Sequence, residues 1–239
     1  QAGPDYDARY YLNEADQYFY RGEYEKALRM YSRAIQSDRT VVEGWLGQVR
    51  CLLEMKQTKE AMVWVRRALE LYAEDPRLIS LQGLTYAQNG MADRGLSCSD
   101  YALGQAGANA SDPLVWIVRG AILSLGDSRN ADICFSKAME MRTRDDWRTP
   151  MTLGLLLLNQ KKWARAVEFL EEAVQIEKRN DYLWERLGYA RERLGLGQAA
   201  HEAYEAALHL NSTNRAAQDG LARLQHSSVW GRLLRWLFK

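Results

Sequence analysis

Cysteine and histidine, the side chains that most often bind metals or act as nucleophiles, are scarce in this sequence. Only three of each occur among 239 residues. Cys51, Cys98 and Cys134 lie far apart, so neither a disulfide framework nor a cysteine metal site is indicated. His201 and His209 are eight residues apart, not at the i, i+4 spacing of a helical metal site. We therefore expect no metal ion, no cofactor and no catalytic residues, and we predict that the protein is not an enzyme.

Charge excess and long apolar runs are also missing. The chain has 32 basic and 31 acidic residues, a net charge of +1, and no basic stripe interleaved with aromatics. Nucleic-acid binding is therefore not expected. No apolar run approaches the roughly 20 residues that a membrane-spanning helix needs. Free cysteines within helical patterns fit a reducing compartment, so we expect the protein to be cytoplasmic.

The clearest positive pattern is a pair of amphipathic helices predicted within residues 147–180. In the first helix Leu153, Leu156 and Leu157 recur at helical spacing, and in the second Ala166 and Leu170 do so. A polar turn at residues 160–162 separates the helices. Neither helix could bury its apolar face alone, so the pair predicts similar neighbours.

The same pattern recurs along the chain. A small residue in each second helix is followed by a larger one four positions later and by Ala after three more. The first members of these triplets are spaced by 34, 34, 36, 35 and 34 residues, at Ala27, Ala61, Gly95, Ala131, Ala166 and Ala200. Most first helices carry a small residue in register, at Ala15, Gly83, Gly120, Gly154 and Gly188, with Val49 as the misfit. We expect the small residues to let the paired helices approach closely and the larger residue to fill the space beside them.

Six such units resemble the tetratricopeptide repeat, a helix–turn–helix of 34 residues. The resemblance rests on the triplets, on the turn glycines Gly22 and Gly90, and on Trp45-Leu46 and the run Trp184 to Gly188. It implies an all-α, right-handed superhelical solenoid. We assign a leader at residues 1–7, a terminal segment at 215–239, and repeats at about 8–40, 41–74, 75–111, 112–146, 147–180 and 181–214. Three of the four prolines, Pro76, Pro113 and Pro150, then fall in the first turn of a first helix.

In tetratricopeptide arrays the first helices line a concave groove that binds a partner protein or peptide. Carried over by position, the resemblance implies a largely apolar binding groove containing Phe19, Tyr20, Leu46, Arg50, Leu53, Leu84, Ile117, Leu155, Leu158 and Tyr189. Tight curvature that buries part of this face is the alternative. Some family members clamp acidic chaperone tails with Lys and Asn four residues apart in the opening helix. Leu12 and Asp16 stand there instead, so such binding is not expected.

Repeat three departs most from the pattern. Gly95 replaces the usual Ala, Ser99 replaces the large residue, and residues 104–111 form a longer loop. Because Gly inside a helix costs roughly 0.5–1 kcal/mol relative to Ala, we expect the interface between repeats three and four to be the weakest.

The last residues differ from the repeats. Residues 215–225 predict a capping helix with one polar face. Ser227 or Ser228 can then cap the start of a second, amphipathic helix. Its stripe has the spacing i, i+3, i+4, i+7 and i+8, at Trp230, Leu233, Leu234, Leu237 and Phe238. Three interpretations remain: packing on the capping helix as a degenerate seventh hairpin, docking into its own groove or that of a second copy, and insertion into a membrane surface.

The function predicted from these features is a non-catalytic scaffold or adaptor. A protein or peptide segment, apolar or helical, would lie in the groove. The alternatives are a peripheral membrane protein anchored by the terminal helix and an accessory subunit of a larger enzyme or assembly complex.

Overall fold

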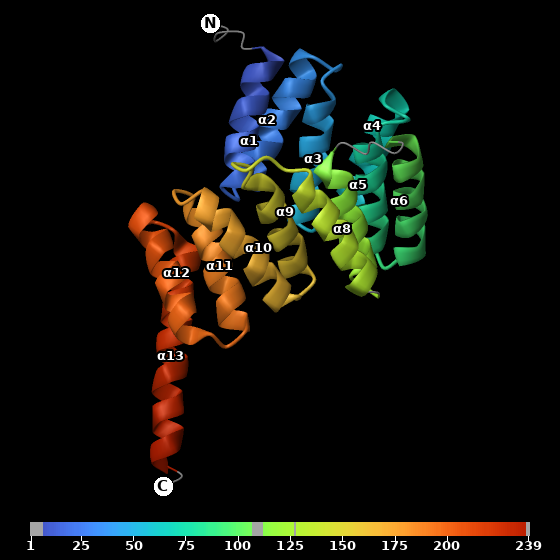
Figure 1. Ribbon diagram of the computed structural model, residues 1–239. Helices are drawn as coiled ribbons and strands as arrows, with labels where there is room; N and C mark the ends of the chain where they lie inside the picture. Colours follow the sequence, from blue (N-terminus) through green and yellow to red (C-terminus); the bar gives the residue numbers. More distant parts are fainter. Residues whose placement is uncertain (1–6, 107–111, 127, 238–239) are drawn as a thin grey trace, which may run out of the picture. The chain divides into compact units, whose positions relative to one another are not determined.

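The computed structural model describes residues 7–106, 112–126 and 128–237, except the side chains of residues 106, 128 and 227–237. The described residues form thirteen helices and no strand (Figure 1). The prediction of an all-α helical-repeat solenoid is therefore confirmed.

The first twelve helices form six consecutive pairs, and one helix follows them. Each predicted repeat range holds one pair. The helices are α1 (Ala8–Tyr20), α2 (Tyr24–Ser37), α3 (Val42–Glu54), α4 (Thr58–Leu71), α5 (Pro76–Gln88), α6 (Ala92–Ala106), α7 (Pro113–Leu123), α8 (Ser128–Glu140), α9 (Arg148–Asn159), α10 (Trp163–Ile176), α11 (Asp181–Arg193), α12 (Gly197–Leu210) and α13 (Arg215–Leu237).

First helices begin at residues that suit a helix N-terminus. Pro76 and Pro113 open α5 and α7, and Pro150 lies in the first turn of α9. At these helix starts a carboxylate or amide oxygen accepts a backbone N–H: Asp75 accepts from Leu78, and Asn180 accepts from Leu183. These bonds satisfy donors that have no partner inside the helix, and they mark where repeats three and six start.

Close approach of paired helices depends on the small-and-large pattern read from the sequence. A Cβ atom added to Gly154 would lie 2.6 Å from Cγ of Leu170, and one added to Gly188 would lie 2.7 Å from Cδ1 of Tyr204. Leu170 and Tyr204 are fully buried. The larger residue of the second helix therefore fills the space that the glycine of the first helix leaves open.

Repeat three uses glycine on both helices. A Cβ atom on Gly83 would lie 2.8 Å from the carbonyl oxygen of Gly95, and one on Gly95 would lie 2.7 Å from the carbonyl oxygen of Gly83. The backbones of α5 and α6 therefore touch, with Ser99 buried nearby in sequence. Gly95 departs from the repeat pattern because this pair packs backbone against backbone.

Five of the hairpin turns share one backbone conformation. Gly22, Lys56, Gly90, Lys161 and Gly195 all have positive φ, between 59° and 81°. In each turn the next residue donates its N–H back to a carbonyl five positions earlier, as Gln57 does to Leu52 at 2.8 Å. This is the Schellman motif, which closes the C-terminus of the first helix. Two of the five turns place lysine where glycine is favoured.

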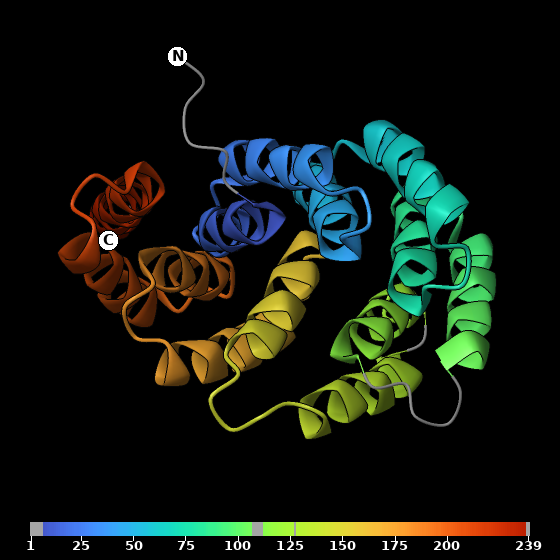
Figure 2. The same ribbon diagram turned by 90° about the horizontal axis from the view of Figure 1, so that it is seen from above.

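The chain divides into two compact units, residues 1–142 and residues 143–239. In the first unit α3 contacts α1 and α5, and α5 contacts α7, so neighbouring hairpins lie side by side (Figure 2). In the second unit α11 contacts α9 and α13 in the same way. The division follows repeat four, whereas the sequence suggested a weak interface after repeat three. The loop at 107–111, part of that suggestion, lies outside the described residues.

The terminal segment differs from the predicted break. Residues 215–237 form one helix, α13, which continues through Ser227 and Ser228 without interruption. The interpretation of a seventh hairpin, with a capping helix and a second helix folded onto it, is therefore wrong. A serine at this position favours a helix start but does not prevent a helix from continuing.

Candidate functional site

Most residues predicted to line the groove are buried. Seven of the ten are between 2% and 7% exposed: Phe19, Leu46, Leu53, Leu84, Ile117, Leu155 and Leu158. Tyr20, Arg50 and Tyr189 are half-exposed. Whether any of the ten contacts a partner stays a prediction. The side chains that remain accessible among them are aromatic or arginine, rather than aliphatic.

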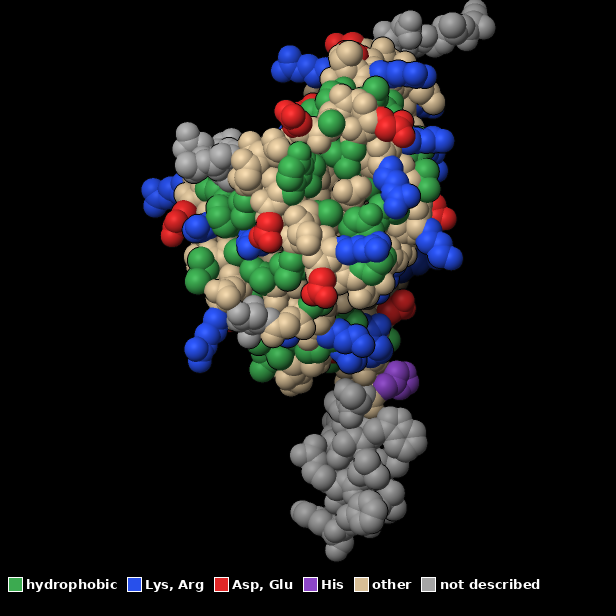
Figure 3. All heavy atoms as spheres, turned by 90° about the vertical axis from the view of Figure 1, so that its right-hand side faces the viewer, with side chains coloured by type: hydrophobic (Ala, Val, Ile, Leu, Met, Phe, Trp, Pro, Cys, Tyr) green, Lys and Arg blue, Asp and Glu red, His purple; other side chains and the backbone are tan. Residues whose placement is uncertain are grey.

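The face of the protein shown in Figure 3 carries side chains of every kind. On the face shown in Figure 3, hydrophobic, basic and acidic side chains are interspersed. Exposed large hydrophobic residues include Tyr101 on α6 and Ile133 on α8, which are second helices. Scattered exposed apolar residues are normal on folded proteins and do not by themselves mark a binding site, whereas organised clusters do.

One organised cluster lies in the first unit, between α1 and α3. The guanidinium carbon of Arg50 is 4.4 Å from the ring centroid of Phe19 and 5.9 Å from that of Tyr20. Beside it, the hydroxyl of Tyr31 donates to Asp16 at 2.6 Å. This arrangement places a half-exposed cation over two aromatic rings.

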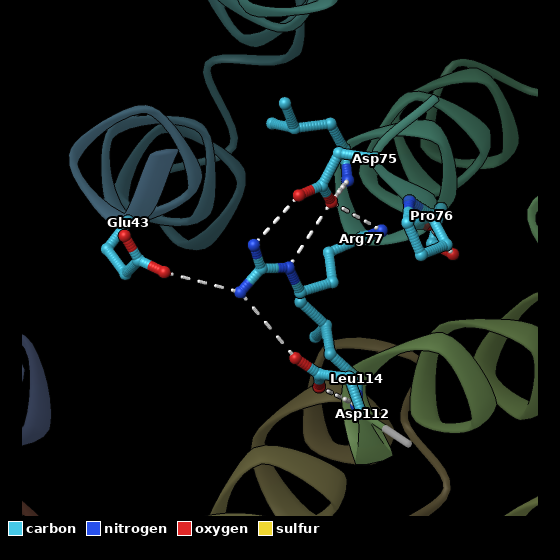
Figure 4. Close-up of polar contacts among 8 residues, drawn as sticks. Glu43, Asp75, Pro76, Arg77, Asp112 and Leu114 are labelled. Atoms are coloured by element: carbon cyan, nitrogen blue, oxygen red, sulfur yellow. Dashed lines mark hydrogen bonds and ion pairs between the residues drawn. The ribbon is translucent and has the colours of Figure 1, made fainter. Parts of the chain in front are cut away.

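A charged cluster joins the starts of three first helices in the same unit (Figure 4). Arg77 at the start of α5 donates to Asp75 at 2.8 Å and 3.2 Å, and it lies 3.5 Å from Glu43 of α3 and 3.9 Å from Asp112 before α7. Burial raises the pKa of Asp75, but its hydrogen bonds and the charge of Arg77 outweigh this effect and hold the pKa below its usual range. The cluster stabilises neighbouring repeats and leaves Arg77 surrounded by carboxylates.

The most extended cluster lies in the second unit, along α11. Tyr182, Arg186, Tyr189 and Arg193 are spaced by four, three and four residues, so they form one stripe of the helix. Arg186 lies 5.3 Å from the ring centroid of Tyr182 and 5.6 Å from that of Tyr189. We call these four residues, together with Trp163 of α10, the arginine–aromatic ladder.

Trp163 extends the ladder onto the neighbouring hairpin. The Trp163 ring meets the Tyr189 ring edge-on, with 5.9 Å between their centroids. The guanidinium carbon of Arg193 lies 5.3 Å from the centroid of the Trp163 ring. All members of the ladder are half-exposed, except Arg193, which is exposed. Leu183, Leu187 and Ala190 of the same helix are buried and hold α11 in place. The ladder is therefore a surface stripe on a packed helix.

The charges of the ladder are only partly balanced. Arg186 donates to both oxygens of Glu185, at 2.5 Å and 2.6 Å, and the Glu185 side chain is only 4% exposed. Within the described part of the chain, no carboxylate lies within 4.0 Å of the charged groups of Arg193, Lys161 or Lys162. Near Trp163 the ladder therefore presents Arg193, which makes no described ion pair, against an aromatic ring, and Lys162 precedes that tryptophan in the chain.

Sequence reasoning found Tyr189 but missed the rest of the ladder. Tyr182, Arg186 and Arg193 are polar or amphipathic, so in the sequence they are typical of a solvated helix face. Their i, i+4, i+7, i+11 spacing on a first helix, close to a tryptophan, is the signal that would have found them.

Comparisons with known proteins agree with this architecture. Residues 18–84 match a family model described as the tetratricopeptide repeat. The crystal structure of the APC/C hetero-tetramer Cut9–Hcn1 is similar in fold, with a TM-score of 0.54 and 15% identity. The chain therefore resembles tetratricopeptide-repeat proteins in part of its sequence and in its fold.

The alignment with Cut9–Hcn1 covers 93% of this chain but only 43% of the other chain, so this chain spans less than half of that neighbour's length. A second solved structure, of YrrB, is titled as a tetratricopeptide-repeat protein with an unusual peptide-binding site. It aligns with a TM-score of 0.44 and 14% identity, over 80% of this chain and 97% of the other. No curated protein matches the sequence.

Other kinds of site are not evident in the described residues. No group of three or more His, Cys, Asp or Glu side chains is placed to hold a metal ion, within the described ranges. Burial raises the pKa of the Cys51, Cys98 and Cys134 thiols, so the reactive thiolate form is disfavoured. None of the helices described is long and apolar enough to span a bilayer.

Proposed function

We propose that this chain is a non-catalytic scaffold or adaptor that binds a segment of a partner protein on the first-helix side of its repeats. Tetratricopeptide-repeat proteins are generally non-catalytic interaction scaffolds. The observation that carries the proposal is the arginine–aromatic ladder, an accessible stripe of rings and cations on the first helix α11 and at the start of α10.

The chemistry of the ladder favours a particular kind of segment. Trp163 and Tyr189 offer flat apolar area at little cost in side-chain entropy, as aromatic residues do at binding hot spots. Arg193 and Lys162 offer donors to a carboxylate beside those rings. A short helix with an apolar face and an Asp or Glu at its edge matches both features.

The Arg50 cluster gives the first unit a second candidate contact. Arg50 and Tyr20 are the half-exposed members of the groove prediction there, and Arg50 lies over Phe19. The buried members of that prediction, such as Leu84 and Ile117, would support the shape of the face rather than touch the partner.

A matched pair of charge reversals tests the proposal. Lys162→Glu with Arg193→Glu changes exposed residues at the ladder, and Lys178→Glu with Arg179→Glu changes exposed residues in the turn before α11. Both double variants alter the net charge equally. We expect proteins captured from cell extract by the wild-type chain, quantified by mass spectrometry, to be lost with the ladder variant and kept with the control.

Equal recovery with both variants would contradict the role of the ladder. Far-UV circular dichroism and the unfolding midpoint of each variant must match those of the wild type. This comparison separates loss of binding from loss of fold, because all four side chains are exposed.

A further inference from the structure

The N-terminal half of α13 is packed firmly against repeat six. The ring of Tyr204 is fully buried between two glycines, Gly188 of α11 and Gly220 of α13. A Cβ atom on either glycine would overlap this ring. Ala217 of α13 is also fully buried, and Leu221 and Leu224 pack against the same cluster. α13 therefore approaches the array as closely as helices within a hairpin approach each other.

Polar contacts fix the same part of α13. Arg223 donates from Nε and Nη2 to the two carboxylate oxygens of Glu192, both at 2.8 Å, and Tyr204 donates to Glu192 at 2.6 Å. The hydrogen bond from Arg223 is the main reason that the pKa of Glu192 lies below its usual range. This bidentate contact joins α13 to α11 and sets the direction in which the helix leaves the array.

Beyond this anchored part the helix continues. α13 has 23 residues and its neighbour α12 has 14, so at least nine residues, about 14 Å, extend past it. Figure 1 shows the C-terminal half of α13 running beyond the ends of α11 and α12. Because the helix is continuous, its end is directed away from the second unit.

The sequence of the extended part has the composition of an interfacial helix. Trp230, Leu233, Leu234 and Leu237 share one stripe at i, i+3, i+4 and i+7. The only charged residues after Arg223 are Arg232, Arg235 and Lys239, and the last acidic residue of the chain is Asp219. An apolar stripe flanked only by cations complements an anionic surface.

We propose that the C-terminal half of α13 binds the surface of a bilayer that contains anionic lipids and so holds the repeat array at the membrane. The helix lies in the interface and does not cross it, since the eleven residues from 227 to 237 reach only about 16 Å. A second copy of the chain fits less well, because pairing two such helices brings cations together with no acidic residue to balance them. This inference is independent of the proposed partner-binding function.

Vesicle co-sedimentation of the full chain tests the proposal. We expect the chain to sediment with vesicles of equimolar phosphatidylcholine and phosphatidylserine, and not with phosphatidylcholine alone. Arg232→Glu with Arg235→Glu should weaken this binding at least about tenfold, because each basic residue near an anionic surface contributes appreciably. Lys178→Glu with Arg179→Glu, which changes the net charge equally, should bind as the wild type does.

A second variant tests the apolar stripe. Trp230→Ser with Leu234→Ser keeps every charge and should also abolish sedimentation with the anionic vesicles. Failure of the wild-type chain to sediment with them would overturn the proposal, as would equal sedimentation of all variants. Analytical ultracentrifugation without lipid should show a monomer, and a dimer that these serine substitutions dissociate would instead assign the stripe to a second copy.

Discussion

At the scale of single residues, glycine decides how closely the helices of a hairpin approach. Gly154 and Gly188 each face one large side chain, whereas Gly83 and Gly95 face each other's carbonyl oxygens. The usual penalty for glycine inside a helix therefore does not describe Gly95. A side chain at this position would push two backbones apart, and backbones cannot yield as a flexible side chain does.

Gly95→Ala should lower the free energy of unfolding by about 1–3 kcal/mol, the range for overpacking a tight contact. Gly104→Ala is the matched control in the same helix, because its added Cβ meets no atom within 4 Å. It should raise stability by roughly 0.5–1 kcal/mol. Urea unfolding followed by circular dichroism measures both changes, and a gain in stability for Gly95→Ala would refute the backbone contact.

The two lysines with positive φ allow a reciprocal test of the shared turn. A non-glycine residue in this conformation costs roughly 1–2 kcal/mol of folding free energy. Glycine avoids this cost, but part of the gain is offset because glycine makes the unfolded chain more flexible. Lys56→Gly should therefore raise the unfolding midpoint, and Gly195→Lys should lower it. Shifts of the same sign in the two variants would show that the turns are not equivalent.

At the scale of elements, α13 is anchored by one ionic contact that depends on pH. The hydrogen bond from Arg223 lowers the pKa of Glu192, so Glu192 stabilises the fold when it is ionised. A carboxyl group with a lowered folded-state pKa contributes stability above its unfolded pKa, and this contribution is lost as the pH falls through the folded pKa.

Glu192→Gln should therefore destabilise the second unit at neutral pH, by about 1–2 kcal/mol, since Arg223 is half-exposed. The difference between wild type and variant should shrink as the pH falls below about 4. Urea unfolding at several pH values measures this difference. A difference that stays constant down to pH ~2 would contradict the ionic role of Glu192.

At the scale of the whole molecule, the repeats could be predicted from the sequence because close helix packing requires small and large residues at fixed spacings. The small residue at 154 and the large one at 170 recur in register, and the structure places them in contact. The exposure of the predicted groove residues was harder to predict, because spacing along a helix cannot tell whether another helix covers Leu155 or Leu158. The continuous α13 was missed because serine only favours a helix start, by about 1 kcal/mol.

Because the chain divides into two compact units, we expect each unit to fold without the other. Residues 1–142 contain four helical hairpins, and residues 143–239 contain two hairpins and α13, each unit with its own buried residues. Stability in a repeat array sums over neighbouring interfaces, so each unit should stay helical and unfold cooperatively when it is produced alone. Circular dichroism and thermal unfolding of the two fragments check this, and a fragment that is unfolded at 25 °C would contradict the division.

The central claim is that the first-helix side of the repeats binds a partner protein, with the arginine–aromatic ladder at its centre. Hydrogen–deuterium exchange of the full chain, with and without a captured partner, tests it most directly. We predict that binding slows exchange in α11, in the turn between α9 and α10 and in the first turn of α10, and leaves the rest of α10 and all of α12 little changed. Protection confined to α12 and to α10 beyond its first turn, with α11 unaffected, would contradict the account.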